Sequence, residues 1–324
     1  MDTSTALSRA TPVRNSTSRI STYRRRWACA LWLDSRHVLL GGLRDDDIVR
    51  WERLDTHTGQ RHRETAFGPT LAQDYDATEA HPFEPLHVSP EGKWLLGEHD
   101  VTRRTGVPGV LGPGGQQQKW QVGKGWSGQL GRWLPDGRSF IGFGFSEPPA
   151  RNELLLFRIG QPHPTVLPLR GLPRPSDSAN TFLLGTTPRH TALLCHYIYP
   201  ENRRLTVYEV PIESGGRARR LGRLLAPEDL SLDWFLSPHG DRVACTASYD
   251  LESKKGVRQH AAGIWVCGTD GYGLRELGRT RWHVAEDNEA LDYGLLGLAW
   301  HPDSRRVSFY HGNADRFQLF TARA

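Results

Sequence analysis

The sequence predicts an all-β fold built from a repeated hairpin, and three observations lead to this prediction. The 324 residues include 34 Gly, 21 Pro and 11 Trp, a composition typical of many short strands joined by tight turns. An apolar segment, a turn of the form Pro-(Asp/Glu/His)-Gly and a second apolar segment recur along the chain. The recurrences are spaced so that each interval can hold one small sheet.

The repeated hairpin occurs in six copies. Four are clear, at residues 86–97, 131–143, 234–246 and 298–310, and two are degenerate, at residues 30–42 and 182–195. Proline fixes φ at about −65° in the first turn position, and glycine accepts the left-handed conformation that closes the hairpin. One copy would be an ordinary hairpin signal, whereas six indicate a repeat architecture.

Two further strands follow most of these hairpins, as in residues 263–279, which gives four antiparallel strands per repeat. Four-stranded sheets repeated around an axis form a β-propeller, so the sequence predicts a six-bladed propeller. The turns lie 45 to 64 residues apart. A blade needs about 40–45 residues, so the longest interval cannot hold another complete blade. Seven blades are the alternative.

Three segments, VSPEGKWLLG, LSPHGDRVACTAS and GIWVCGTDGYGLRELG, resemble the WD40-like (PD40) repeat of TolB-type and prolyl-oligopeptidase propellers. The resemblance covers nearly the whole chain and implies the propeller architecture. It implies little about activity, because this fold carries many unrelated functions. No Gly-x-Ser-x-Gly motif of an accompanying hydrolase domain occurs.

The two ends of the chain are expected to meet. The last repeat supplies three strands, ending at residues 316–322, and an unpaired outer edge would expose a row of backbone donors and acceptors. Residues 18–23 (SRISTY) have strand character, so we expect them to pair with residues 316–322 and close the ring. Residues 1–17 are then a flexible basic tail, and residues 18–324 form one domain.

Composition restricts the partners. The net charge is +5, and residues 1–26 contain six Arg and one Asp, so the tail accounts for the excess (6 − 1 = 5) and the rest is nearly neutral. We therefore do not expect a nucleic-acid partner.

Without an apolar leader or a membrane-spanning segment, a cytoplasmic protein is expected, with its four cysteines as thiols. Pairing of Cys245 with Cys267 and the oligomeric state are left open.

The partner site is expected on the loop-rich face. Residues 97–115, 247–262 and 280–294 are the longest excursions from a minimal blade, and long loops in compact domains are often functional. Within 97–115, the Gly/Pro-rich segment 106–115 is predicted to be a flexible surface loop. Aromatic, arginine and histidine side chains of the other two loops are the candidate partner-binding residues: Tyr249, Arg258, His260, Trp282 and Tyr293.

Three histidines, His99, His196 and His311, are weak candidates for metal ligands, since each ends the second strand of a blade. Oligogalacturonate lyase, a metal-dependent propeller enzyme that this class of fold resembles, uses histidine ligands. However, the three lie on alternate blades and one strand away from the axis, which separates them by more than about 10 Å, against a metal–nitrogen distance of about 2.1 Å. We therefore predict no metal site and, since no cofactor motif occurs, no cofactor.

Two functions are compatible with these observations. The first is a non-catalytic scaffold that binds a protein or peptide on the loop-rich face. The second is an enzyme, lyase- or hydrolase-like, acting on a small or saccharide substrate at the channel mouth. The sequence favours the scaffold, because it contains no catalytic signature.

If residues 18–23 complete the last blade, deleting residues 1–24 will expose a sheet edge. The truncated protein should then melt at a lower temperature and aggregate more readily than the full chain, by calorimetry and light scattering. A truncated protein as stable and soluble as the full chain would contradict the predicted closure.

Overall fold

The computed structural model describes residues 28–43, 48–67, 70–71, 81–101, 107–122, 127–146, 151–173, 179–198, 204–213, 216–225, 232–252, 258–283, 295–313 and 316–324. These residues form 26 strands and one 3-10 turn, η2 (Pro113–Gly115). In chain order the strands are β1 (Ala28–Trp32), β2 (His37–Leu43), β3 (Ile48–Asp55), β4 (Arg61–Glu64), β5 (Thr70–Leu71), β6 (His81–Val88), β7 (Leu95–Val101), β8 (Val107–Leu111), β9 (Gln117–Lys119), β10 (Ser127–Trp133), β11 (Ser139–Ser146), β12 (Arg151–Arg158), β13 (Thr165–Leu167), β14 (Leu169–Arg170), β15 (Ala179–Thr187), β16 (Thr191–Ile198), β17 (Arg204–Pro211), β18 (Gly216–Arg217), β19 (Arg219–Leu225), β20 (Leu232–Leu236), β21 (Arg242–Glu252), β22 (Arg258–Gly268), β23 (Arg275–His283), β24 (Leu295–Trp300), β25 (Arg306–Asn313) and β26 (Arg316–Arg323).

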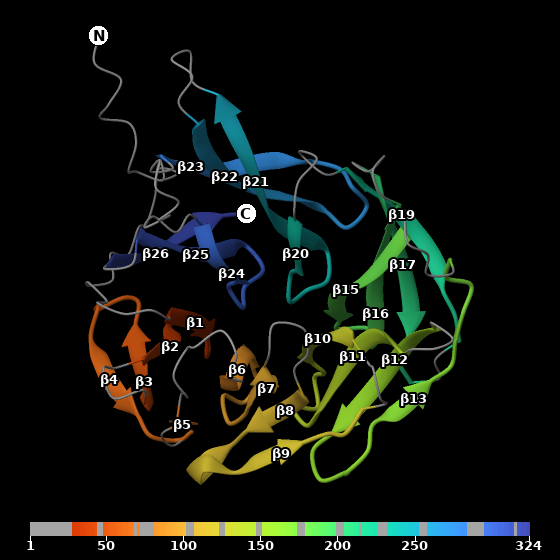
Figure 1. Ribbon diagram of the computed structural model, residues 1–324, viewed down its shortest axis with the longest axis horizontal. Helices are drawn as coiled ribbons and strands as arrows, with labels where there is room; N and C mark the ends of the chain where they lie inside the picture. The colour runs from red at the N-terminus through yellow and green to blue at the C-terminus, as the bar shows by residue number, and fades with distance from the viewer. Residues whose placement is uncertain are drawn as a thin grey trace.

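The strands form six antiparallel sheets arranged in a ring, which confirms the six-bladed propeller (Figure 1). Blades 1 to 5 have the strand orders β1-β2-β3-β4, β6-β7-β8-β9, β10-β11-β12-β13, β15-β16-β17-β19 and β20-β21-β22-β23, and the described part of blade 6 is β24-β25-β26. In addition, β5 pairs with β3, and a short parallel ladder, β14–β18, joins the rims of blades 3 and 4. The expected partner of β26, residues 18–23, lies outside the described residues. No helix in the described part of the chain is long and apolar enough to cross a membrane.

The apolar core lies between the blades. Six clusters of buried side chains occur, and each contains residues of two neighbouring blades. Buried pairs that share a cluster are Leu39 with Leu95, Leu96 with Phe140, Leu154 with Leu194, Leu193 with Val243, Ala244 with Val307, and Leu40 with Leu319. The last pair joins blade 1 to blade 6, so apolar packing continues around the whole ring.

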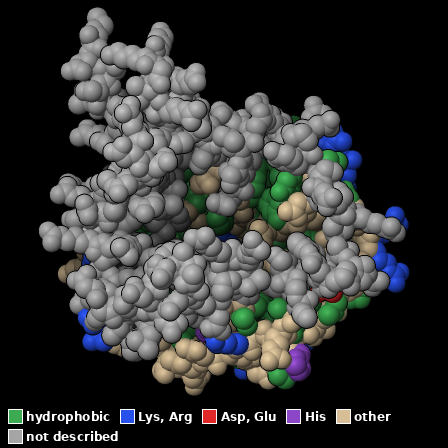
Figure 2. All heavy atoms as spheres, in the orientation of Figure 1, with side chains coloured by type: hydrophobic (Ala, Val, Ile, Leu, Met, Phe, Trp, Pro, Cys, Tyr) green, Lys and Arg blue, Asp and Glu red, His purple; other side chains and the backbone are tan. Residues whose placement is uncertain are grey.

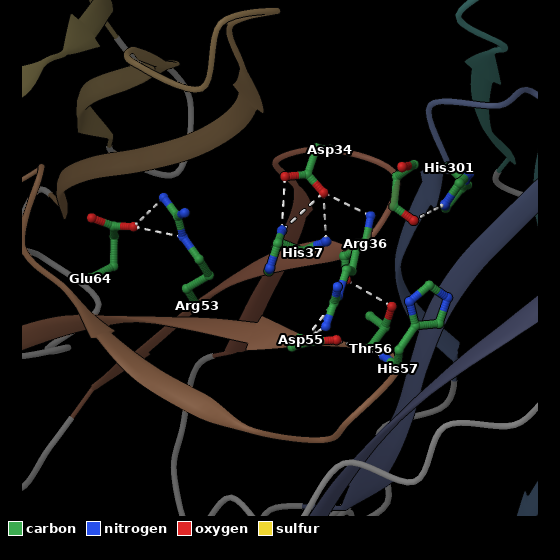
Figure 3. Close-up of polar contacts among 10 residues, drawn as sticks. Asp34, Arg36, His37, Arg53, Asp55, Thr56, His57, Glu64 and His301 are labelled. Atoms are coloured by element: carbon green, nitrogen blue, oxygen red, sulfur yellow. Dashed lines mark hydrogen bonds and ion pairs between the residues drawn. The ribbon is translucent and has the colours of Figure 1, made fainter.

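Polar contacts reinforce the seam between blades 1 and 6. The Trp32 indole Nε1 donates a hydrogen bond to Ser308 Oγ at 2.9 Å, and the Trp32 ring packs edge-on against His301 at 4.4 Å. The His301 side chain is fully buried, and its Nε2 lies 3.0 Å from the carbonyl oxygen of Ser35. Figure 3 shows His301 beside the first turn of blade 1. The two ends of the described chain are therefore joined by side chains as well as by the core.

The repeated turns have the predicted geometry. In blades 2 to 6, the fourth turn residue donates its backbone N–H to the carbonyl of the first and has a positive φ. Glycine occupies this position three times, as Gly92, Gly137 and Gly240, with φ between 62° and 74°. His190 and Ser304 occupy it in blades 4 and 6, each with φ of 56°. The degenerate sequence of blade 4 thus keeps the turn conformation without its glycine.

Two of these glycines should respond differently to substitution. A Cβ at Gly92 would meet no atom within 4 Å, whereas a Cβ at Gly240 would lie 2.9 Å from the side chain of Thr187 on blade 4. Gly92→Ala should therefore lower the free energy of unfolding by about 1 kcal/mol, through backbone strain alone. Gly240→Ala should lower it by at least about 2 kcal/mol, because overpacking adds to the strain. Urea denaturation measures both values. An equal loss of unfolding free energy in the two variants would show that the turn of blade 5 does not pack against blade 4.

Candidate functional site

In blade 5, most of the loop expected between the second and third strands is a β-hairpin. β21 and β22 pair without interruption from Arg242 opposite Gly268 to Glu252 opposite Arg258. The prediction of a loop over residues 247–262 was therefore wrong for all but residues 253–257, which lie outside the described residues. Polar and apolar residues alternate from Ser248 to Glu252, which is the period of a strand, and this signal was available in the sequence.

The predicted loop 97–115 also contains regular structure. β7 continues to Val101, and β8 (Val107–Leu111) is the third strand of blade 2, with Val110 and Leu111 in the core. The prediction of a flexible loop over residues 106–115 was wrong for residues 107–111, which form β8. Gly109 is present there because β8 lies very close to β7. A Cβ there would lie 2.1 Å from the imidazole of His99, so glycine permits the close approach of β8 to β7.

Four of the five candidate partner-binding residues lie on the extension of blade 5. His260 is directly opposite Asp250 on β21 and opposite Trp282 on β23. Tyr249 is one residue from this row, and Arg258 begins β22. The backbone therefore brings four residues together on one three-stranded projection. Tyr293, like residues 284–294 as a whole, lies outside the described residues.

The three histidines do not gather into a common site. The His99 ring is buried and packs against Phe83 at 4.7 Å between ring centroids. The His196 Nδ1 lies 2.9 Å from Thr181 Oγ1, and burial lowers the pKa of this imidazole. His311 is placed by backbone pairing with Leu295. Among the described residues, no three His, Cys, Asp or Glu side chains are arranged to hold a metal ion.

Three cysteines share the core cluster between blades 4 and 5. Cys195, Cys245 and Cys267 are buried and are free thiols. In the strand register Cys245 is opposite Trp265, and Cys267 is opposite Val243. Burial raises the pKa of all three thiols, to about 11 for Cys267. The structure therefore gives them a packing role, as small apolar side chains.

A network of charged side chains occupies the turns of blade 1 (Figure 3). Asp34 Oδ1 accepts hydrogen bonds from the backbone N–H groups of Arg36 and His37, at 2.7 and 2.8 Å. Asp55 accepts the Arg36 Nε–H and the backbone N–H of His57, each at 2.9 Å. The hydrogen bond from Arg36 holds the pKa of Asp55 well below its usual range. These carboxylates are occupied by their own turns, so the network is a structural device rather than a catalytic one.

Sequence reasoning missed two residues at the innermost strands. The register of β6 against β7 shifts between Pro85 and His87, and that of β10 against β11 shifts between Leu130 and Trp133. Such shifts are β-bulges, which insert an extra residue and redirect its side chain. Pro85 is opposite Gly97 and His87 is opposite Leu96, so the extra residue of β6 is Leu86, directly before His87. On β10, Gly131 and Arg132 lie within the corresponding shift.

The neighbours of His87 and Arg132 pack into different interblade cores. Leu86 packs with the core between blades 2 and 3, and Val88 packs with the core between blades 1 and 2. On β10, a Cβ at Gly131 would touch Leu183 of blade 4, whereas Trp133 packs toward blade 2. His87 and Arg132 themselves are partly exposed.

These two polar residues lie on the innermost strands of adjacent blades. The surrounding protein lowers the pKa of Arg132 to about 10. Burial and the charge of Arg132 lower the pKa of His87 to about 3, so its imidazole is neutral at physiological pH. Figure 2 shows one face of the molecule hollowed near its middle, with hydrophobic side chains visible in the hollow. In the sequence, each is a polar residue two positions before the first residue of the repeated turn. His87 precedes Ser89 in L-H-V-S-P, and Arg132 precedes Leu134 in G-R-W-L-P.

Comparison with known proteins places the chain by fold only. No family model matches it, and no curated protein matches it. It is similar to a protein assigned as TolB from Agrobacterium tumefaciens, at 14% identity over 93% of this chain and 91% of that chain, with a TM-score of 0.49. TolB from Acinetobacter baumannii is 16% identical over 78% of this chain and 56% of that chain, with a TM-score of 0.46. Oligogalacturonate lyase from Vibrio parahaemolyticus is 12% identical over 95% and 92%, with a TM-score of 0.49. No activity or partner is transferred from these structures, and the propeller fold itself rests on the strand pairing.

The Asp55–Arg36 contact should shape the response to acid. Because folding lowers the pKa of Asp55, the contact contributes stability above about pH 4, near the ordinary pKa of aspartate, and loses it as the pH falls. Between pH 5 and pH 2.5, which bracket the ordinary pKa of aspartate, the free energy of unfolding of Asp55→Asn should therefore decrease less than that of the unsubstituted protein. Urea denaturation at several pH values measures this. Arg36→Met should have the same effect, and the double variant should add nothing; acid profiles parallel to that of the unsubstituted protein would contradict the assignment.

Proposed function

We propose that this propeller is a non-catalytic scaffold that binds a protein or peptide partner on the face where blade 5 is extended. One observation carries the proposal. β21 and β22 have 11 residues each, whereas the second strands of the other blades have 7 or 8. Figure 1 shows β21 extending past the neighbouring strands at the top of the view. The ring does not need this extra length, since the other blades pack without it.

Among the described residues, the extension has a strand edge without a partner strand. The pairing of β20 with β21 ends at Leu232 opposite Ala247, so residues 248–252 have no partner strand on that side among the described residues. Such an edge presents unpaired backbone donors and acceptors, which an extended segment of another protein can complete. We propose that the partner contributes such an extended segment.

The residue types of the extension fit recognition. Tyr, Trp and Arg dominate the energetics of protein interfaces, and Tyr249, Arg258 and Trp282 stand on adjacent strands with His260 between them. Tyr293 belongs to the same proposed surface through its place in the chain. In the backbone register Asp250 is opposite His260 and Glu252 is opposite Arg258.

A second candidate, an enzyme acting on a small or saccharide substrate at the channel mouth, has one observation in its favour. His87 and Arg132 are partly exposed polar residues on the innermost strands of blades 2 and 3. General acid–base catalysis requires a group that gains or loses a proton near the working pH. A neutral imidazole with a pKa of about 3 and a permanently charged guanidinium are poorly suited to this role. The scaffold is therefore the function we favour.

The strand register provides a clean test of the scaffold. Ala247 is directly opposite Gly263, so joining them through Asn-Gly removes the extension and leaves a regular two-residue hairpin. In the matched control, Ser146 opposite Arg151 is joined in the same way on blade 3. Partners are captured with the full chain, and affinity is then measured with the purified partner. The shortened blade 5 should fold and bind at least about tenfold more weakly, and Trp282→Ala alone should weaken binding about tenfold.

The control should bind with unchanged affinity. Circular dichroism and melting temperature establish that each variant is folded. A shortened blade 5 that is folded and binds the same partner with unchanged affinity would overturn the proposal. Equal losses in both variants would place the contact on the face in general rather than on blade 5.

A further inference from the structure

We propose that the outer rim of the propeller, where blade 4 meets blade 5, binds an acidic, extended segment of a partner protein. The rim patch consists of Arg217, Arg220, Leu221 and Arg223 of blade 4 and Tyr272 of blade 5. Tyr272 lies in the turn between β22 and β23, whereas the docking surface proposed above lies at the other end of β22. The two proposals are therefore independent.

Close backbone packing joins the two parts of the rim patch. A Cβ at Gly222 would lie 3.4 Å from the carbonyl oxygen of Asp270, and a Cβ at Gly271 would overlap the carbonyl oxygen of Arg223. These glycines permit the turn of blade 5 to lie directly against β19. The turn is itself fixed, because Tyr272 donates its backbone N–H to Asp270 Oδ1 at 3.0 Å. The rim patch is therefore one surface, built before any partner arrives.

The arginines of the rim patch are exposed and lack counter-charges. Arg217, Arg220 and Arg223 form no ion pair with a carboxylate in the part of the chain that the structure describes. The remaining arginine of this segment, Arg219, is paired with Glu209 at 2.5 Å. Figure 2 shows Lys and Arg side chains along the rim at the right of the view, where Figure 1 places β17 and β19. The rim patch therefore attracts negative charge.

The β14–β18 ladder brings a further arginine beside the rim patch. Arg170 is exposed and is directly opposite Arg217 in this ladder. Leu169 packs with the core between blades 3 and 4, so the next side chain, Arg170, points away from that core. Like charges directly opposite each other are destabilising. A carboxylate bound between the two guanidinium groups would remove this repulsion.

Positive charge lies on both faces of β19. Arg219 is opposite Glu209 and Arg220 is opposite Tyr208, so the two arginines are on opposite faces of the strand. The register then shifts, which leaves Leu221 as an extra residue with an exposed side chain. β17 pairs with one edge of β19, and no strand of the described residues pairs with the other. An extended segment along this edge would have a guanidinium group on either side of it.

The apolar members of the rim patch favour a peptide over a nucleic acid. The described residues include four large hydrophobic side chains that are exposed, and two of these, Leu221 and Tyr272, belong to the rim patch. Tyr272 is 80% exposed although its backbone is fixed. An acidic peptide can offer carboxylates to the guanidinium groups and an apolar side chain to Leu221 and Tyr272. A phosphate backbone has no group to place against the aliphatic side chain.

The test uses the full chain and a fluorescently labelled peptide in which Leu and Phe stand between Glu residues. Saturable binding that salt weakens is expected in fluorescence anisotropy. Arg220→Gln combined with Arg223→Gln should weaken binding at least about tenfold and reduce its dependence on salt. Tyr272→Ala should weaken binding at least about fivefold.

A matched control removes the same charge elsewhere. Arg138→Gln combined with Arg305→Gln changes exposed turn positions of blades 3 and 6 and should leave the affinity unchanged. Circular dichroism and light scattering establish that each variant is folded and monodisperse. The variant without the blade 5 extension should bind the acidic peptide as the unsubstituted protein does, which separates this proposal from the scaffold function.

Four results would overturn the proposal. The first is the absence of saturable binding of the acidic peptide, and the second is unchanged affinity in the rim variants. The third is an equal loss of affinity in the two arginine pairs, which would indicate attraction by net charge alone. The fourth is tighter binding of a single-stranded oligonucleotide of the same charge, which would assign the rim patch to nucleic acid.

Discussion

Each sheet of this protein has two apolar faces and no other layer within its own repeat to cover them. An isolated blade would leave both faces in water, so stability comes from the contact between one blade and the next. The six core clusters follow this rule, since each is shared by two neighbouring blades and none lies inside a single sheet. Closure of the ring is therefore required energetically, and the contact of Leu319 with the core of blade 1 completes it.

The polar seam between blades 1 and 6 depends on the same constraint. His301 is fully buried, and a buried imidazole without hydrogen-bond partners would be costly. The carbonyl of Ser35 provides one partner across the seam, and Asp303, 2.9 Å from Nδ1, provides another within blade 6. The seam thus combines apolar packing with a polar contact that fixes how the first and last blades are aligned.

Stacking of the blades also explains where side chains are free to act. The central strands use their alternating residues to fill the two adjacent cores. At the periphery the extension of β21 and β22 is free of this constraint, because it continues beyond the length that the cores require. The proposed docking surface is therefore a place where the chain departs from the repeat.

The sequence by itself determined the number of blades, the four-strand pattern and the turn geometry, because these depend on local signals. Proline and glycine restrict φ within a few residues, and alternation marks a strand without reference to its neighbours. Even His190 and Ser304 adopt the expected left-handed conformation, since the flanking strands impose the hairpin on them. The five candidate partner residues remain a prediction, and the segment that holds Tyr249, Arg258 and His260 is a hairpin rather than a loop.

Only the tertiary structure decided where the innermost strands depart from regular pairing. The shifts in β6 and β10 occur in strands of ordinary composition and depend on the register against the next strand. The same applies to Gly109, which appeared to mark a loop and instead permits His99 to pack against β8. Register and interblade packing join residues far apart in the chain, so no local pattern could specify them.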